Sequence, residues 1–195
     1  MTKSELRSIY LKRRRSLSPD EIANKSREIA DRFFSGIDLA AIKTLHTYIP
    51  IARLGEIDTS LIYQKVWTYF PLIRTFAPRL DLERCDMENI AFGPQTQLIE
   101  NGWGIREPVG DESVGAAEID LVLVPLLCFD THGHRVGYGR GFYDRLLSKS
   151  GPDCLKMGLS YFAPETAVDD AKEHDVMLDR CITPEGIVEF GTDGP

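Results

Sequence analysis

Polar and hydrophobic residues alternate over the first 36 positions with the period of an α-helix. Two stretches each open with a capping box, in which Ser or Thr and a following Glu satisfy free N–H groups of the first helical turn. Thr2 with Glu5 and Ser18 with Glu21 form these boxes. In the second stretch the hydrophobic residues share one face up to Gly36. We therefore predict two helices, of which the second packs against the core.

Short β-branched and aromatic runs alternate with helical stretches in the rest of the chain. Residues 120–125 form a continuous apolar run, typical of a central strand covered on both faces in a parallel sheet. The other predicted strands span residues 44–49, 68–73, 155–160 and 176–183, and further helices are predicted at 59–66 and 142–149. This alternation predicts an α/β fold: a three-layer sandwich with a mostly parallel central sheet, Rossmann-like in outline. We expect one domain over residues 1–190 and a disordered tail at 191–195.

The composition is that of a globular protein, with 43% hydrophobic and 27% charged residues. The longest apolar run, residues 121–129, is far shorter than the roughly 20 residues that span a bilayer, and the N-terminus has no apolar leader. The four cysteines are widely spaced, lack a C-x-x-C pair and are expected to be reduced thiols. We therefore expect a cytoplasmic protein that does not bind a membrane.

The net charge of −7 is distributed unevenly along the chain. Residues 1–15 hold six basic side chains and one acid, so this segment carries +5 and the remainder carries −12. An acidic body argues against broad nucleic-acid binding, whereas a local basic cluster can still gather an anion such as a nucleoside triphosphate. We expect no nucleic-acid partner.

Residues 129–144 hold the densest chemistry, between the predicted central strand and a predicted helix. Four glycines fall within nine residues, at positions 133, 137, 139 and 141, and Arg135 and Arg140 add positive charge. Glycines let the backbone approach a ligand, and ligands of open α/β sheets bind beyond the carboxyl ends of the strands. The spacing matches neither a P-loop nor a dinucleotide fingerprint. From the residues alone, a phosphate-binding loop and a structural turn both remain open.

This segment resembles the signature of the 5-formyltetrahydrofolate cyclo-ligase family, in which Phe-Asp and His-Gly precede Arg-x-Gly-x-Gly-x-Gly, an aromatic residue and Tyr-Asp. The resemblance covers nearly the whole chain. Further matching segments are Lys3-x-x-x-Arg7, Glu56-Ile-Asp-Thr59, Gly102-Trp-Gly-Ile-Arg-Glu-Pro108 and His174-Asp175-Val-Met-Leu-Asp179. The resemblance implies an ATP- and Mg²⁺-dependent cyclisation of 5-formyltetrahydrofolate to 5,10-methenyltetrahydrofolate, in which the formyl oxygen is phosphorylated and ADP and phosphate are released.

By this resemblance two segments are expected to bind ATP, and Arg140 and Tyr143 are expected to act in catalysis. The expected ATP contacts are Lys3, Ser4, Glu5, Leu6, Arg7, Arg135, Val136, Gly137, Tyr138, Gly139, Arg140, Gly141, Phe142 and Tyr143. Without the family, Lys3 and Arg7 would be interpreted as the solvated basic face of a helix. We interpret the basic residues 12–15 in that way, because the resemblance does not single them out.

The resemblance also implies a folate site and a metal site. The expected folate contacts are Arg7, Ile51, Glu56, Trp103, Tyr138, Gly139, Arg140, Gly141 and Phe142. Glu56 is expected to recognise the pterin, and Asp144 and Asp175 are expected to hold Mg²⁺. From the residues alone, Glu56 would be a loop acid, Asp144 a first-turn helix residue and Trp103 equally well a buried structural residue.

Two positions depart from the family pattern: residue 142 is Phe where Tyr is common, and residue 140 is Arg where Lys or Gly is usual. Arg140 keeps the positive charge but presents a planar fork in place of a compact ammonium.

His46 lies in a predicted strand and is interpreted as a packing residue.

Two other functions remain open. One is a different ATP-dependent transferase or kinase on the same scaffold, which would not depend on folate. The other is a non-catalytic nucleic-acid-binding module that uses residues 12–15 and binds more weakly as salt rises. The expected substrate is a small folate, with or without a polyglutamate tail, and the expected oligomeric state is a monomer or a weak homodimer.

Overall fold

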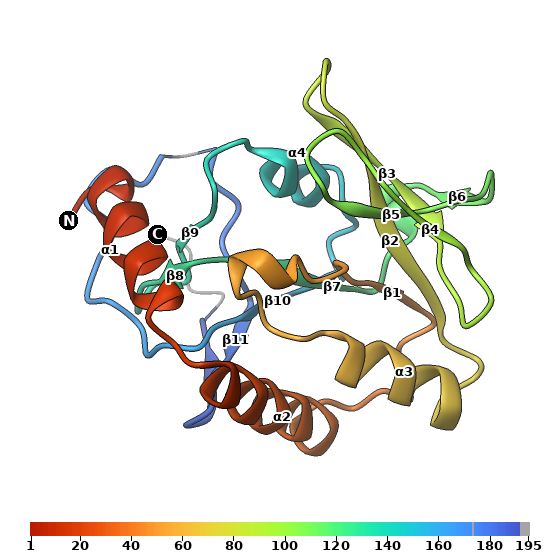
Figure 1. The fold of residues 1–195 in the computed structure, drawn as a ribbon, viewed down its shortest axis with the longest axis horizontal. Helices are drawn as coiled ribbons and strands as arrows, with labels where there is room; N and C mark the ends of the chain where they lie inside the picture. Colours follow the sequence, from red (N-terminus) through yellow and green to blue (C-terminus); the bar gives the residue numbers. More distant parts are fainter. Residues whose placement is uncertain (173, 192–195) are drawn as a thin grey trace.

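The computed structural model describes residues 1–172 and 174–191, and an eight-stranded sheet forms its centre (Figure 1). The strands are β1 Thr44–His46, β2 Arg74–Asp81, β3 Asp86–Ala91, β6 Ser113–Val114, β7 Leu121–Pro125, β10 Leu155–Leu159, β11 Arg180–Ile182 and β12 Ile187–Glu189. Their order across the sheet is β12-β11-β10-β7-β1-β2-β3-β6. The strands from β11 to β2 pair in parallel, whereas β12, β3 and β6 add antiparallel edges.

Helices cover both faces of this sheet (Figure 1). Helices α2 (Pro19–Gly36) and α3 (Ser60–Tyr69) pack on one face, and α4 (Phe142–Ser148) packs on the other. Helix α1 (Lys3–Arg15) lies beside the two-stranded ribbon of β8 (Cys128–Phe129) and β9 (Arg135–Val136). A second ribbon joins β4 (Leu98–Glu100) to β5 (Arg106–Pro108), and 3₁₀ turns occur at η1 (Ala52–Leu54) and η2 (Ala116–Glu118). The expected three-layer α/β sandwich is confirmed.

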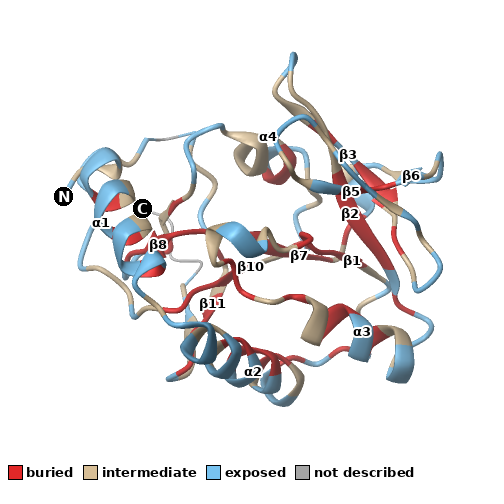
Figure 2. Ribbon diagram, in the orientation of Figure 1, coloured by how far each residue is buried: buried red, intermediate tan, exposed pale blue. Residues whose placement is uncertain are grey.

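The core explains why β7 is so apolar. β7 is bonded on both sides, with Leu121 in register with Leu45 of β1 and with Leu155 of β10. Leu121 and Leu123 face the α2 and α3 layer, and Val122 and Val124 face α4, all at 0% exposure. Figure 2 shows the buried residues along the sheet and on the inward faces of the helices. A strand buried on both faces needs apolar side chains at every position.

Most predicted elements are present near their predicted bounds. Both capping boxes are formed, at Thr2 with Glu5 and at Ser18 with Glu21. The strand predicted at 68–73 is wrong, because α3 continues to Tyr69 and the strand begins only at Arg74. Tyr69 is the last residue of α3 and is exposed, and Phe70 caps the helix, so the aromatic content of this segment belongs to a helix end.

Four strands between residues 86 and 114 were not predicted. They are antiparallel additions at the sheet edge and the β4–β5 ribbon, which are short and mixed in polarity.

Within the described residues, no helix is both long and apolar enough to cross a membrane. The predicted tail lies outside the described residues from position 192 onward, and the single-domain assignment stays a prediction.

Candidate active site

A cavity of about 640 Å³ opens beyond the carboxyl ends of the central strands. Its floor includes Pro125 at the end of β7 and Tyr48 just after β1, and its walls come from α1, η1, the β4–β5 ribbon and the segment from β9 into α4. Ligands of open α/β sheets bind at this edge, because the loops that leave the strands diverge there.

Most residues expected at the site line this one cavity. They are Lys3, Ser4, Arg7, Ile51, Glu56, Trp103, Arg135, Val136, Gly137, Tyr138, Gly139, Arg140, Gly141, Phe142, Tyr143, Asp144 and Asp175. The structure does not bring the other two into it. Leu6 is buried in the core beneath α1, and Glu5 is used by the capping box with Thr2.

The glycine loop after β9 keeps its backbone donors free. In the part of the chain that the structure describes, no backbone N–H of residues 138–144 donates a hydrogen bond. Gly139 and Gly141 have φ angles of 86° and 71°, which glycine adopts without strain. Arg7 Nε donates to the Gly137 carbonyl at 2.9 Å. The loop is thus tied to α1 through a carbonyl, which leaves its N–H groups for an anion.

A chain of hydrogen bonds runs from α1 to the cavity, and it begins at a buried arginine. Arg14 is 4% exposed and donates through Nη1 to the Tyr138 hydroxyl at 2.9 Å, and its Nη2 donates to the Leu126 carbonyl. The Tyr138 hydroxyl in turn donates to Glu56 Oε1 at 2.8 Å. Glu56 Oε2 accepts the N–H of Ile51 at 2.8 Å. The chain fixes the position of a carboxylate in the cavity wall.

The interpretation of Arg14 as a solvated basic residue is therefore wrong. The signal was present in the spacing, because Leu6, Tyr10 and Arg14 are four positions apart and form the buried face of α1. Its neighbours Lys12, Arg13 and Arg15 are exposed, as expected. A charged residue on a buried helix face is retained when its donors have fixed partners.

The environment of Glu56 is set by burial and by its donors. Burial raises the pKa of Glu56, while the Ile51 N–H, the Tyr138 hydroxyl and the charge of Arg14 act against that rise. Each carboxylate oxygen accepts one hydrogen bond from the protein, so each keeps capacity for a second. The group can therefore accept paired hydrogen bonds from a ligand in the cavity.

Two further acids of the cavity are paired with cations. Asp144 Oδ1 accepts from Arg135 Nη2 at 2.5 Å, and Asp175 Oδ2 pairs with Lys3 Nζ. Burial would raise the pKa of Asp175, but hydrogen bonds from Lys3 and from the Lys172 N–H lower it. Burial lowers the pKa of Arg135, against the attraction of Asp144 and Asp175. Both acids thus act on the same guanidinium.

Tyr143 is half-buried in the cavity wall. Burial raises the pKa of Tyr143, as does the charge of Glu56, while Arg135 opposes them. The phenol therefore stays protonated at neutral pH. Its oxygen lies 3.3 Å from His46 Nε2.

The mouth of the cavity holds Trp103 and Arg140, which were expected there, and three cations that were not predicted. Trp103 is 40% exposed, which excludes the buried structural alternative, and the Arg140 guanidinium lies 5.2 Å from the centre of its ring. Arg53 Nη2 donates to the Trp103 carbonyl. Arg53, Arg106 and Lys172 also line the cavity, but no local pattern in the sequence distinguishes them from surface cations.

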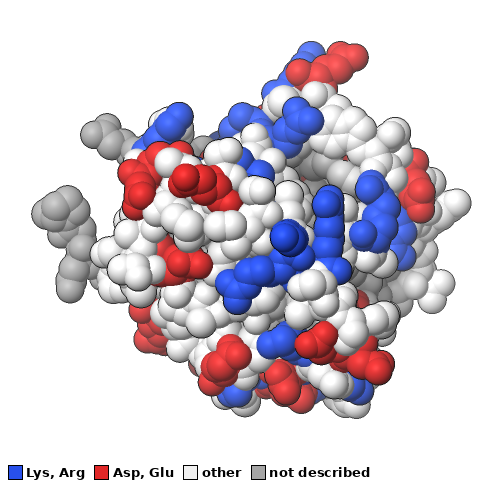
Figure 3. Space-filling view, turned by 60° about the vertical axis from the view of Figure 1, so that its left-hand side comes forward, with Lys and Arg blue, Asp and Glu red and all other residues white. Residues whose placement is uncertain are grey.

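The cavity is positively charged in an acidic protein. Seven Lys or Arg and four Asp or Glu residues line it, whereas the whole chain carries −7. Figure 3 shows Lys and Arg side chains gathered around a hollow on this face. Such a site concentrates anions against the field of the rest of the molecule.

A family model described as the 5-formyltetrahydrofolate cyclo-ligase family matches residues 1–184. The chain is 25% identical to the 5-formyltetrahydrofolate cyclo-ligase of Escherichia coli K12, a match that covers 91% of this chain and 98% of the relative. It is 29% identical to the 5-formyltetrahydrofolate cyclo-ligase of Mycolicibacterium smegmatis, with 96% of each chain covered.

Solved structures with the same architecture bear related names. A 5,10-methenyltetrahydrofolate synthetase from Mycoplasma pneumoniae has a TM-score of 0.75 and 25% identity, with 95% of this chain and 100% of that chain covered. The 5,10-methenyltetrahydrofolate synthetase of Aquifex aeolicus has a TM-score of 0.76 and 28% identity, with 100% and 95% covered.

Proposed function

The chain belongs to the 5-formyltetrahydrofolate cyclo-ligase family, and from this membership we propose how its own residues carry the family's reaction. The reaction is the ATP-dependent cyclisation of 5-formyltetrahydrofolate to 5,10-methenyltetrahydrofolate, with release of ADP and phosphate. The supporting observation is that one cavity joins a glycine loop with free N–H donors to a fixed carboxylate, Glu56.

In the proposed mechanism the formyl oxygen attacks the γ-phosphorus of ATP, and ADP leaves. The lone pair of N10 then forms a bond to the formyl carbon, the phosphorylated oxygen departs as phosphate, and N10 gives up its proton. Both steps demand close alignment of two bound molecules, and the protein contributes mainly position and charge.

ATP is proposed to lie against the glycine loop. The N–H groups of residues 138–144 are free to donate to phosphate oxygens, and Lys3 and Arg7 reach the same cavity from α1. Arg140 is exposed at the mouth, where its guanidinium can follow the negative charge of the transferring phosphoryl group. Of the five ATP contacts expected between residues 3 and 7, Lys3, Ser4 and Arg7 line the cavity and are kept in the proposal, whereas Glu5 and Leu6 are not.

The folate is proposed to lie on the side of Glu56 and Trp103. A pterin presents an N–H and an amino group side by side, and the free acceptor capacity of Glu56 suits such a pair. Ile51 and Tyr48 line the same wall, and the Trp103 ring is exposed at the mouth for stacking. Phe142, which lacks the hydroxyl of the usual Tyr, contributes apolar surface only.

Asp144 and Asp175 are proposed to hold Mg²⁺. The donor set fits, because Mg²⁺ in proteins is commonly held by one or two carboxylates together with phosphate oxygens and water. Both acids line the cavity and both attract Arg135. When bound, the ion would neutralise charge on the triphosphate during transfer. Arg135 and Lys3, which now pair with these acids, would then be available to phosphate oxygens.

The experiment that tests the function mixes the protein with ATP, Mg²⁺ and 5-formyltetrahydrofolate and follows the near-ultraviolet absorbance of the methenyl product. We expect ADP and methenyl product to form in equal amounts, and ADP formation to need the folate, since a phosphate acceptor must occupy the site before transfer. Rapid ATP hydrolysis that is indifferent to folate would refute the assignment.

We also propose that the protein acts in the cytoplasm as a monomer or weak homodimer, without nucleic-acid or membrane partners, on folates with or without a polyglutamate tail. The net charge of −7 disfavours nucleic acid, and the four cysteines carry free thiols. Sedimentation analysis and KM values for folates with and without a polyglutamate tail would test these points.

A further inference from the structure

His46 is a fully buried histidine whose ring meets the wall of the active-site cavity. It lies on β1 at 0% exposure, and its Nε2 is 3.3 Å from the Tyr143 hydroxyl. The two rings meet edge to face, with centroids 5.8 Å apart and planes at 79°. The interpretation of His46 as a packing residue explains its burial but leaves this polar contact without a role.

The second ring nitrogen of His46 has a complementary neighbour. Among the described residues, His46 Nδ1 and Asn89 Oδ1 are buried side-chain atoms without a hydrogen-bond partner. Burial lowers the pKa of His46 to about 4, against an interaction with the Asn89 side chain that raises it. The two unpaired atoms are chemically complementary, because Nδ1 can donate a hydrogen bond and the amide oxygen can accept one.

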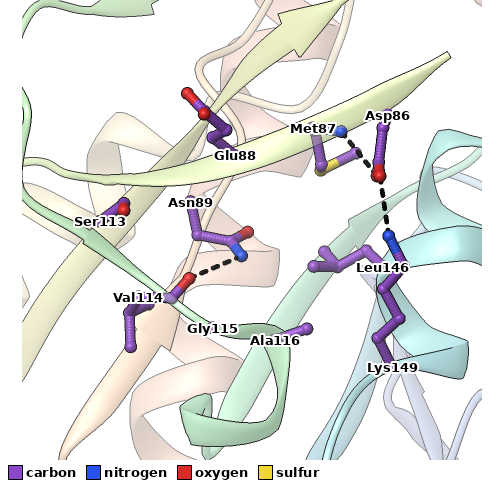
Figure 4. Close-up of a pocket in the computed structure, with 10 residues that line it drawn as sticks. All are labelled: Asp86, Met87, Glu88, Asn89, Ser113, Val114, Gly115, Ala116, Leu146 and Lys149. Atoms are coloured by element: carbon purple, nitrogen blue, oxygen red, sulfur yellow. Dashed lines mark hydrogen bonds and ion pairs between the residues drawn. The ribbon is translucent and has the colours of Figure 1, made fainter. Parts of the chain in front are cut away.

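The orientation of Asn89 decides which atom it offers to the ring. Asn89 Nδ2 donates to the Val114 carbonyl at 3.1 Å, beside a small cavity of about 220 Å³ (Figure 4). Its remaining polar atom is an oxygen, which can only accept. A neutral His46 that donates from Nδ1 has a bare Nε2, so the Tyr143 hydroxyl must be the donor in the contact between them.

We propose that His46 is a positioning residue, held by Asn89 in the Nδ1–H tautomer, which directs the Tyr143 hydroxyl proton away from the cavity. The inference rests on the proposed function, because Tyr143 lies in the proposed reaction site. The phenolic oxygen then faces the cavity as an acceptor. The N10 amine of the folate is a donor whose lone pair must point at the formyl carbon, and accepting its N–H would orient it.

The tautomer can be measured without catalysis. Long-range ¹H–¹⁵N spectra of protein labelled at its four histidines resolve the two ring nitrogens of each, and the His46→Leu variant assigns the His46 signals. We expect His46 to show the Nδ1–H tautomer and to stay neutral from pH 5 to 8, because its burial disfavours the charged ring. An Nε2–H tautomer, or a titration in that range, would overturn the proposal.

Kinetics test the positioning role. His46→Leu should lower kcat about five- to tenfold with KM for ATP little changed, because one hydrogen bond to a catalytic group is lost. His46→Gln should restore part of the rate, since its side-chain oxygen can accept from Tyr143. His132→Leu, at an exposed histidine outside the cavity, is the matched control and should keep wild-type turnover.

The double variant separates positioning from mere packing. If His46 acts through the hydroxyl, His46→Leu added to Tyr143→Phe should lower kcat no further than Tyr143→Phe alone. Multiplied losses, or an equal loss in His46→Gln and His46→Leu with unchanged melting temperatures, would overturn the proposal. Absence of turnover in the wild type would refute the proposed function instead, and the tautomer spectra would then decide the proposal.

Discussion

Replacing Glu56 by Gln tests the folate site most directly. The carboxylate accepts the Ile51 N–H at one oxygen and the Tyr138 hydroxyl at the other, both at 2.8 Å. Gln can satisfy only one of these donors, because its second group is an NH₂. If that NH₂ donates to the Tyr138 oxygen, which also accepts from Arg14, the phenolic proton loses its acceptor. The variant therefore loses the negative charge and one of the two hydrogen bonds that fix the side chain at position 56.

The expected loss follows from the hydrogen bond that the ligand would lose. A hydrogen bond to a charged group contributes about 2 kcal/mol, which corresponds to about a thirtyfold rise in the KM for 5-formyltetrahydrofolate. The KM for ATP should change less than about threefold, because the glycine loop is untouched. Stability should fall little: burial raises the pKa of Glu56, so its ionised form is favoured less in the folded protein than in the unfolded chain.

The sign of the pH dependence follows from the same shift. As pH falls through the raised pKa of Glu56, protonation removes the charge, and wild-type folate KM should rise toward that of the variant while the fold gains stability from this group. Glu107→Gln is the matched control, a buried acid outside the cavity whose Oε1 accepts from Leu80 N and Asn101 Nδ2. Equal losses of folate and ATP affinity in Glu56→Gln would refute the reasoning.

Three further predictions concern the rest of the site. Gly139→Val should weaken ATP binding at least about tenfold, because the φ angle of Gly139 is 86° and a Cβ there would lie 3.1 Å from the Arg7 side chain. Titration calorimetry measures this affinity, and an unchanged value would exclude the loop as the phosphate site. Arg14→Met should raise folate KM about fivefold by releasing the Tyr138 hydroxyl, and an equal rise for ATP would contradict this. Asp144→Asn and Asp175→Asn should each raise the Mg²⁺ concentration for half-maximal rate, and the double variant should be little worse than the poorer single one; wild-type Mg²⁺ dependence in both would remove the metal assignment.

Features that depend on neighbours in the chain could be predicted from the sequence. The two capping boxes need only a Ser or Thr and a Glu three positions later, and both are formed as predicted. The apolar run of β7 revealed a strand buried on both faces. The glycine loop was found from its dense glycines and from its resemblance to the family signature. Its residues line one cavity together with Lys3, Glu56 and Asp175, which lie in the other segments that match the family.

The tertiary structure decided which polar residues are buried and what they contact. Arg14 is separated by 124 positions from Tyr138, and His46 by 97 from Tyr143, so the sequence around each residue does not reveal its polar partner. The edge strands β3 and β6 depend on antiparallel pairing, of β3 with β2 and of β6 with β3, more than on the strand propensity of their own residues. Hydrophobic periodicity and motifs act over a few residues, whereas the environment of a charged or polar group is set by whichever distant segments fold against it.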